Sequence, residues 1–100
     1  MKLMTKAIEK KMPALYATEG ISEPNKRAFV KYFNPVGSAT WYGVEYDPDE
    51  RIFFGYVDYI EKEWGYFSLD ELEALRLPFG LRIERDLHFE PTLMSNIIKR

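Results

Sequence analysis

Residues 40–59, TWYGVEYDPDERIFFGYVDY, constrain the fold most, because two aromatic and β-branched runs flank the turn-forming sequence DPDE. Such a pattern is typical of a β-hairpin. A loop over residues 47–50 predicts a register with Gly43 opposite Phe54 and Gly55 opposite Tyr42, so that a ring covers each glycine. Both faces of this hairpin are apolar. Either other elements cover both faces, or one aromatic face, including Trp41 and Tyr56, is exposed and binds a partner.

Helix signals stand before and after the hairpin. Thr5 is placed to cap a short helix that ends near Met12 and Pro13. After the strand-like EWGYF, the sequence SLDELEAL has Ser68 and Glu71 at capping-box spacing, with Phe67 and Leu72 at the spacing of a hydrophobic staple. This predicts a helix near residues 69–76.

The remaining segments complete the predicted architecture. RAFVKYF, residues 27–33, and GLRIERDLHF, residues 80–89, have strand character. Near the C-terminus, one helical stripe is predicted, with Lys99 and Arg100 suited to its end; its apolar residues are Leu93, Met94, Ile97 and Ile98. We therefore expect a single α+β domain over residues 1–100, with a mostly antiparallel meander sheet of four to five strands, a short N-terminal helix and a short C-terminal helix.

Composition narrows the chemistry. The chain is 46% hydrophobic and 16% aromatic, which is typical of a folded protein. It has no cysteine and a single histidine, His88, so disulfides, thiolate sites and zinc sites built on paired histidines are not expected. Any metal would have to be held by carboxylates and carbonyls, and we assign neither a metal nor a cofactor. Because no signal-like or 18-residue apolar run occurs, we expect a soluble cytoplasmic protein that does not span a membrane.

Charge is distributed unevenly along the chain. Residues 45–73 contain ten acidic side chains against two basic ones, whereas residues 1–44 contain seven basic side chains against three acidic ones. A surface made from the middle segment, including Asp47, Asp49 and Glu50, would favour a basic partner. The same acids would also occur in a solvated hairpin turn. These three acids lack the spacing of a twelve-residue calcium loop.

Arg85 lies in an apolar row. Under strand alternation Leu81, Ile83, Leu87 and Phe89 share its face, so a buried Arg85 needs a carboxylate such as Glu45 or Glu71, or a bulge that turns it outward. A ligand carboxylate or other anion is the functional alternative. Glu84, Asp86 and His88 would lie on the opposite face, so the four residues do not converge, and we assign no catalytic residue.

A nucleic-acid interface is a second alternative. Helical spacing places Lys2, Lys6 and Lys10 on one side of the first helix. A basic stripe with a stacking ring could start at Lys26, Arg27, Lys31 and Tyr32.

Taken in order, TWYGVEYD, FFGYV, WGYFSLDEL and GLRIERDLHFEP resemble the domain of unknown function 2958 family over nearly the whole chain. Trp64 stands where the family pattern has a leucine before the glycine, and keeps that position apolar. The resemblance implies small bacterial proteins of plasmids, phages and integrative elements, and an accessory role there that includes interference with host defence. It implies no catalytic residue.

The leading functional hypothesis is a non-enzymatic protein that binds another protein through an acidic or aromatic surface. A nucleic-acid binder using the first helix is the alternative, and a ligand or enzyme site around Arg85 is the third hypothesis. Oligomeric state and partner identity do not follow from the sequence.

Overall fold

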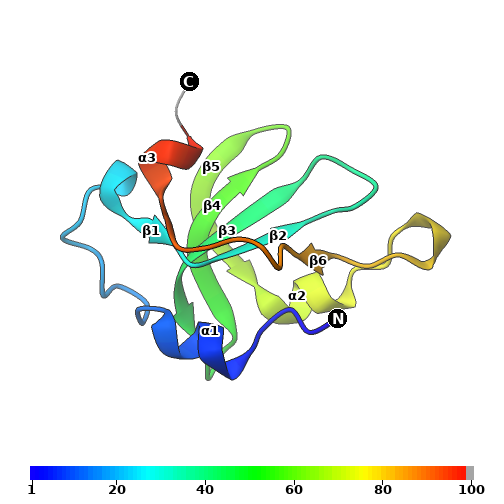
Figure 1. Cartoon of the computed structure of the whole chain (residues 1–100), viewed down its shortest axis with the longest axis horizontal. Helices are drawn as coiled ribbons and strands as arrows, with labels where there is room; N and C mark the ends of the chain where they lie inside the picture. Colours follow the sequence, from blue (N-terminus) through cyan, green and yellow to red (C-terminus); the bar gives the residue numbers. More distant parts are fainter. Residues whose placement is uncertain (99–100) are drawn as a thin grey trace.

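The computed structural model describes residues 1–98, and its main feature is a five-stranded antiparallel sheet (Figure 1). The sheet order is β5-β4-β3-β2-β6, and a second sheet pairs β1 with β7. In chain order the elements are α1 (Lys6–Lys11), the 3-10 turn η1 (Glu23–Asn25), β1 (Arg27–Ala28), β2 (Val30–Phe33), β3 (Thr40–Asp47), β4 (Ile52–Asp58), β5 (Lys62–Ser68), α2 (Leu69–Ala74), the 3-10 turn η2 (Pro78–Gly80), β6 (Glu84–Arg85), β7 (Thr92–Leu93) and α3 (Met94–Ile97). The predicted α+β class with an antiparallel meander is confirmed.

Hydrophobic cores lie on both faces of the large sheet. Phe53 and Tyr56 are three residues apart on β4, so their side chains point to opposite faces. Phe53 belongs to a core closed by the N-terminal segment and α2, and Tyr56 to a second core closed by α3. Of the two arrangements left open by the sequence, coverage of both faces by other elements is therefore the one that forms at these two cores.

The register of β3 against β4 differs from the prediction. Gly43 lies opposite Gly55, not Phe54, and Tyr42 lies opposite Tyr56, not Gly55. The loop begins one residue later than expected, because Arg51 adopts a positive φ of 57° and its N–H donates to the Asp47 carbonyl at 2.7 Å. A bulge between Gly43 and Glu45 then shifts the pairing again.

Three glycines consequently lie side by side across β3, β4 and β5: Gly43, Gly55 and Gly65. A Cβ atom at Gly43 would lie 2.9 Å from the Phe53 ring, and one at Gly55 would lie 1.9 Å from the Tyr42 carbonyl oxygen. At Gly65 nothing lies within 4 Å of that position. Glycine is thus required at Gly43 and Gly55, inside the sheet, whereas a side chain would have space at Gly65 on the outermost strand.

A buried polar cluster fastens the long loop before β1 to the sheet. Glu45 is 3% exposed and accepts hydrogen bonds from the Tyr16 N–H at 2.8 Å and the Thr18 N–H at 3.0 Å. The Thr18 hydroxyl also donates to Glu45 and accepts from the buried Lys26 Nζ at 2.9 Å. One of the acids expected on the surface is therefore a structural group of the interior.

The helix caps agree with the sequence. The Ile8 N–H donates to Thr5 Oγ1 at 3.1 Å, and the Glu71 N–H donates to Ser68 Oγ at 3.2 Å. Phe67 and Leu72 pack in the same core, as a hydrophobic staple requires. The C-terminal helix is only four residues long, with Met94 buried and Ile97 packed beside it. Lys99 and Arg100, expected at its end, lie outside the described residues.

No helix within residues 1–98 has the length and apolar character needed to cross a bilayer.

Replacing Ser68 with alanine should lower the free energy of unfolding by about 1 kcal/mol, because the first turn of α2 loses its side-chain acceptor. Urea unfolding followed by circular dichroism measures the change. Ser38→Ala, at an exposed loop position, is the matched control. Equal unfolding midpoints for the two variants would contradict the role of the cap.

Candidate functional site

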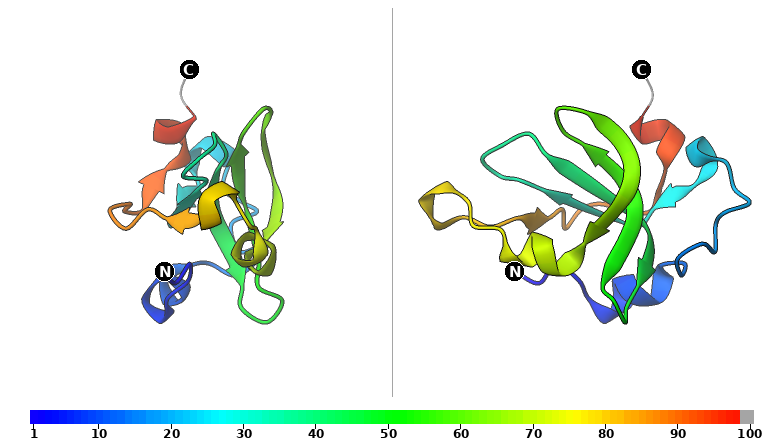
Figure 2. Two further views of the ribbon diagram at one scale, coloured as in Figure 1. Left: turned by 90° about the vertical axis from the view of Figure 1, so that its right-hand side faces the viewer. Right: turned by 180° about the vertical axis from the view of Figure 1, so that it is seen from behind.

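The acids of residues 45–73 do not form one surface. Asp49 and Glu50 lie in the β3–β4 turn, whereas Glu61 and Glu63 lie at the β4–β5 turn, at the other end of β4 (Figure 2). With seven residues in β4, the two turns are about 20 Å apart. The expected single acidic face is wrong, because antiparallel pairing sends successive turns to opposite ends of the sheet.

The β3–β4 turn is a self-contained structure. Asp47 Oδ1 accepts from the Asp49 N–H at 3.0 Å, which is a local turn contact. Asp49 and Glu50 are exposed. Among residues 1–98, no group of three or more ligating side chains is placed to hold a metal ion.

Trp41 and Tyr56, expected on an exposed aromatic face, pack instead against the two cores. Tyr56 is 8% exposed, and Trp41 is half-buried. These rings therefore offer little surface to a partner.

The segment around Arg85 is not a regular strand. Only Glu84–Arg85 pairs with β2, and Ile83 and Phe89 pack in different cores, so the chain crosses from one face to the other. Leu81 and Leu87 are exposed. The expected apolar row is wrong, because a strand of two residues cannot sustain the alternation.

Arg85 itself holds the N-terminal segment. Its guanidinium Nη1 donates to the Lys2 carbonyl at 2.7 Å, and its backbone N–H approaches Met1 Sδ at 3.1 Å. Neither Glu45 nor Glu71 pairs with it within residues 1–98, so the expected buried ion pair is wrong. On the neighbouring strand the Tyr32 hydroxyl donates to the Leu3 carbonyl at 2.6 Å, and burial raises the pKa of this hydroxyl.

The neighbouring polar side chains do not converge on a reaction centre. Asp86 lies 3.8 Å from Lys31 Nζ, and its Oδ1 accepts from the His88 backbone N–H at 2.9 Å. Glu84 faces the large hollow described next, and the His88 side chain is exposed. These contacts are those of a charged surface turn beside the sheet.

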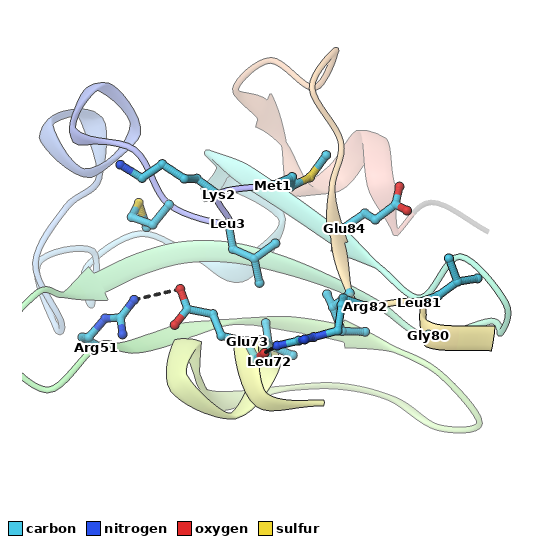
Figure 3. Close-up of a pocket in the computed structure, with 12 residues that line it drawn as sticks. Met1, Lys2, Leu3, Arg51, Leu72, Glu73, Gly80, Leu81, Arg82 and Glu84 are labelled. Atoms are coloured by element: carbon cyan, nitrogen blue, oxygen red, sulfur yellow. Dashed lines mark hydrogen bonds and ion pairs between the residues drawn. The ribbon is translucent and has the colours of Figure 1, made fainter. Parts of the chain in front are cut away.

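A large hollow, of about 700 Å³, lies between the N-terminal segment, α2 and residues 80–84 (Figure 3). Its floor is apolar, with Leu3, Leu72 and Ile83, and its walls carry Lys2, Arg51 and Arg82 together with Glu73 and Glu84.

Internal contacts engage both arginines of this hollow. Arg51 binds Asp70, and its Nη2 donates to Glu73 at 3.0 Å; the hydrogen bond with Glu73 raises the pKa of the guanidinium. Arg82 Nη2 donates to the Glu73 backbone carbonyl at 3.0 Å. The two guanidinium groups are therefore used to hold α2 against the sheet, and they do not form the free guanidinium pair of an anion site.

The basic row expected on the first helix is shorter than the spacing suggested. The helix begins at Lys6, so Lys2 lies outside it and lines the large hollow. Lys6 and Lys10 remain exposed on α1.

The outer edge of β5 carries unpaired backbone groups. Ser68 lies opposite Ile52, so the next residue, Leu69, lies opposite Arg51. The Leu69 N–H donates to the Arg51 carbonyl at 2.9 Å, which makes this a hydrogen-bonded pair. In an antiparallel ladder this pattern makes the odd-numbered residues of β5 the ones that bond β4. The N–H and C=O groups of the even residues point away from β4: Lys62, Trp64, Tyr66 and Ser68. Within residues 1–98, no strand lies beyond them.

Aromatic and apolar side chains border this edge. Trp64 stacks on Phe54 with ring centroids 5.6 Å apart, and Tyr66 lies 5.3 Å from the same ring. At the β4–β5 turn Tyr59 is 53% and Ile60 85% exposed. A second hollow of about 540 Å³ lies among Val57, the turn and Gly65.

The opposite edge of the sheet is closed by comparison. There β6 contributes only two residues, and the N-terminal segment contacts Arg85. Short and covered edges are the usual protection against pairing with other chains. Sequence reasoning missed Tyr59, Ile60 and Gly65. The sequence signal that could have indicated them is the apolar pair Tyr59 and Ile60 inside a charged turn, followed by Gly65 in an aromatic strand.

A family model described as a protein of unknown function, DUF2958, matches residues 3–99. The chain belongs to this family. Its match spans all the strands and helices described above, including β5 and the hollow beside it. Searches of curated proteins and of solved structures found no match to the chain.

Arg85→Ala should lower the free energy of unfolding by about 1–2 kcal/mol, because it removes one charged hydrogen bond to a backbone carbonyl and leaves no carboxylate unpaired. Chemical unfolding measures the change, with Arg76→Ala, an exposed arginine after α2, as the control. A loss above about 3 kcal/mol would indicate a buried ion pair at Arg85, which residues 1–98 do not contain.

Proposed function

We propose that the protein is a non-enzymatic accessory protein that binds an extended segment of another protein along β5. The supporting observation is the outer edge of the seven-residue strand β5, on which alternate backbone donors and acceptors have no strand partner within residues 1–98. Strand addition to such an edge is a common mode of peptide recognition, with backbone hydrogen bonds supplying affinity.

The acidic and aromatic features of the leading hypothesis meet at this edge. Trp64 and Tyr66 lie in its middle, and Glu61 and Glu63 lie at its start. Asp70 and Glu71 follow at the N-terminus of α2. Asp70 is paired with Arg51, and Lys62 lies between Glu61 and Glu63, so each end of the edge keeps an excess of one carboxylate, which favours a partner with a basic character.

The remaining hypotheses have weaker support. Of the basic residues expected in one row, only Lys6 and Lys10 lie on α1, and the polar residues near Arg85 are engaged in turn and backbone contacts. In line with the family resemblance, we place the protein in the bacterial cytoplasm, in the service of a mobile genetic element.

The test uses a capped seven-residue peptide of alternating threonine and valine as a probe, with amide shifts of β5 recorded by NMR. We expect saturable shifts at Trp64 and Tyr66, whose N–H groups face the added strand. Tyr66→Pro should weaken binding by roughly tenfold or more relative to Tyr66→Ala, because proline removes the outward donor without removing a bond to β4.

Both variants lose the tyrosine ring, so their comparison isolates the backbone N–H. Equal binding by the two variants, or shifts confined to other surfaces, would contradict strand addition on β5.

A further inference from the structure

The hollow beside β5 lies at the edge of the sheet, and part of its lining belongs to the face that carries Phe67. Val57, Glu63 and Gly65 all point to this face, since they share the odd positions of β4 and β5 with Phe53 and Phe67. Phe53 and Phe67 stack with centroids 4.9 Å apart at the end of the core. At Gly65, beyond these rings, no atom of residues 1–98 lies within 4 Å of the position that a Cβ would take.

A strand added to β5 would deliver a side chain into this hollow. In a paired ladder, the residue directly opposite Gly65 has its Cβ on the same face as the glycine position. The hollow is bordered by Val57, Tyr59 and Ile60, so it suits a large apolar side chain. A ring placed over a strand glycine is a known stabilising arrangement at sheet edges.

The carboxylates near Gly65 indicate which residue the partner strand carries at a second position. Glu63 lies two residues from Gly65 on the same face, and Glu61 lies in the adjoining turn. Both carboxylates are exposed, and neither forms an ion pair within residues 1–98. A lysine or arginine opposite Glu63 would meet both of them.

We propose that the bound segment is an extended strand with a large apolar residue opposite Gly65 and a lysine or arginine two residues away, opposite Glu63. This inference rests on the proposed strand addition to β5. The backbone groups of the edge provide affinity, and the hollow with its carboxylates selects the sequence.

A second copy of this chain fits the edge less well. On the relevant face β5 offers Glu63, Gly65 and Phe67. The first has the wrong charge, the second has no side chain, and Phe67 is stacked on Phe53 in its own core. Antiparallel self-pairing centred on Gly65 would also bring the acids of the β4–β5 turn near those at the start of α2.

The experiment compares capped seven-residue peptides with threonine at the odd positions. The parent carries valine, phenylalanine and lysine at its second, fourth and sixth positions, which face Phe67, Gly65 and Glu63 in an antiparallel complex. One control replaces the phenylalanine with alanine, and another replaces the lysine with glutamate. NMR titration gives each affinity, and the β5 amide shifts locate the complex.

We expect the parent to bind about tenfold more tightly than the alanine peptide. We also expect it to bind about threefold more tightly than the glutamate peptide at low salt. Gly65→Leu should fold normally, because its Cβ meets no atom within 4 Å, and should remove the preference for phenylalanine by filling the hollow. Glu63→Lys should reverse the preference between lysine and glutamate.

The outcomes separate this inference from the function on which it rests. Equal affinity of all peptides, with shifts on β5, would overturn the selectivity while leaving strand addition intact. If no peptide shifts the β5 amides, including the threonine–valine probe, strand addition itself is wrong and the inference falls with it. A dimer in sedimentation that Gly65→Leu abolishes would assign the hollow to a second copy and overturn the proposed partner.

Discussion

The close approach of Gly55 to the Tyr42 carbonyl is the constraint on which the rest of the sheet depends. Any side chain at Gly55 would collide with that oxygen, 1.9 Å from the Cβ position. The contact lies in the register that aligns Gly43, Gly55 and Gly65 across three strands. The innermost glycine is covered by Phe53, and the outermost lies at the free edge with open space beside it. The arrangement that allows the strands to pack closely therefore also creates the hollow next to β5.

The two hydrophobic cores explain why partner binding is assigned to an edge of the large sheet and not to one of its faces. Glu45, Thr18 and Lys26 hold the loop before β1 against the sheet, and α3 completes that side. On the other side, Arg51 and Arg82 hold α2 in place, while Arg85 and Tyr32 hold the N-terminal segment. Most aromatic rings of the sheet are thereby used in packing. The exposed apolar groups of the β4–β5 turn and the backbone of β5 remain accessible.

Local signals in the sequence predicted the elements well, because caps and strand patterns act over a few residues. Ser68 and Thr5 cap the helices as their spacing indicated, and the antiparallel α+β class follows from the hairpin. The register could not be obtained in this way, since it depends on a positive φ at Arg51 and on a bulge beside Glu45. Alternation failed around Arg85, where the chain crosses between two cores. Trp41 and Tyr56 were expected at the candidate site. The candidate site lies instead at the free edge beside Gly65, which could not be predicted, because the whole topology decides which strand ends the sheet.

The most direct measurement of the central claim is residue-resolved amide hydrogen exchange along β5. If the outer edge is free, Trp64 and Tyr66 should exchange quickly, whereas Gly65 and Phe67, bonded to β4, should be protected. Such alternation along consecutive residues has no explanation in local unfolding, which would expose all of them together. Uniform protection of residues 63–67 would show that the edge is already paired, and would contradict the account.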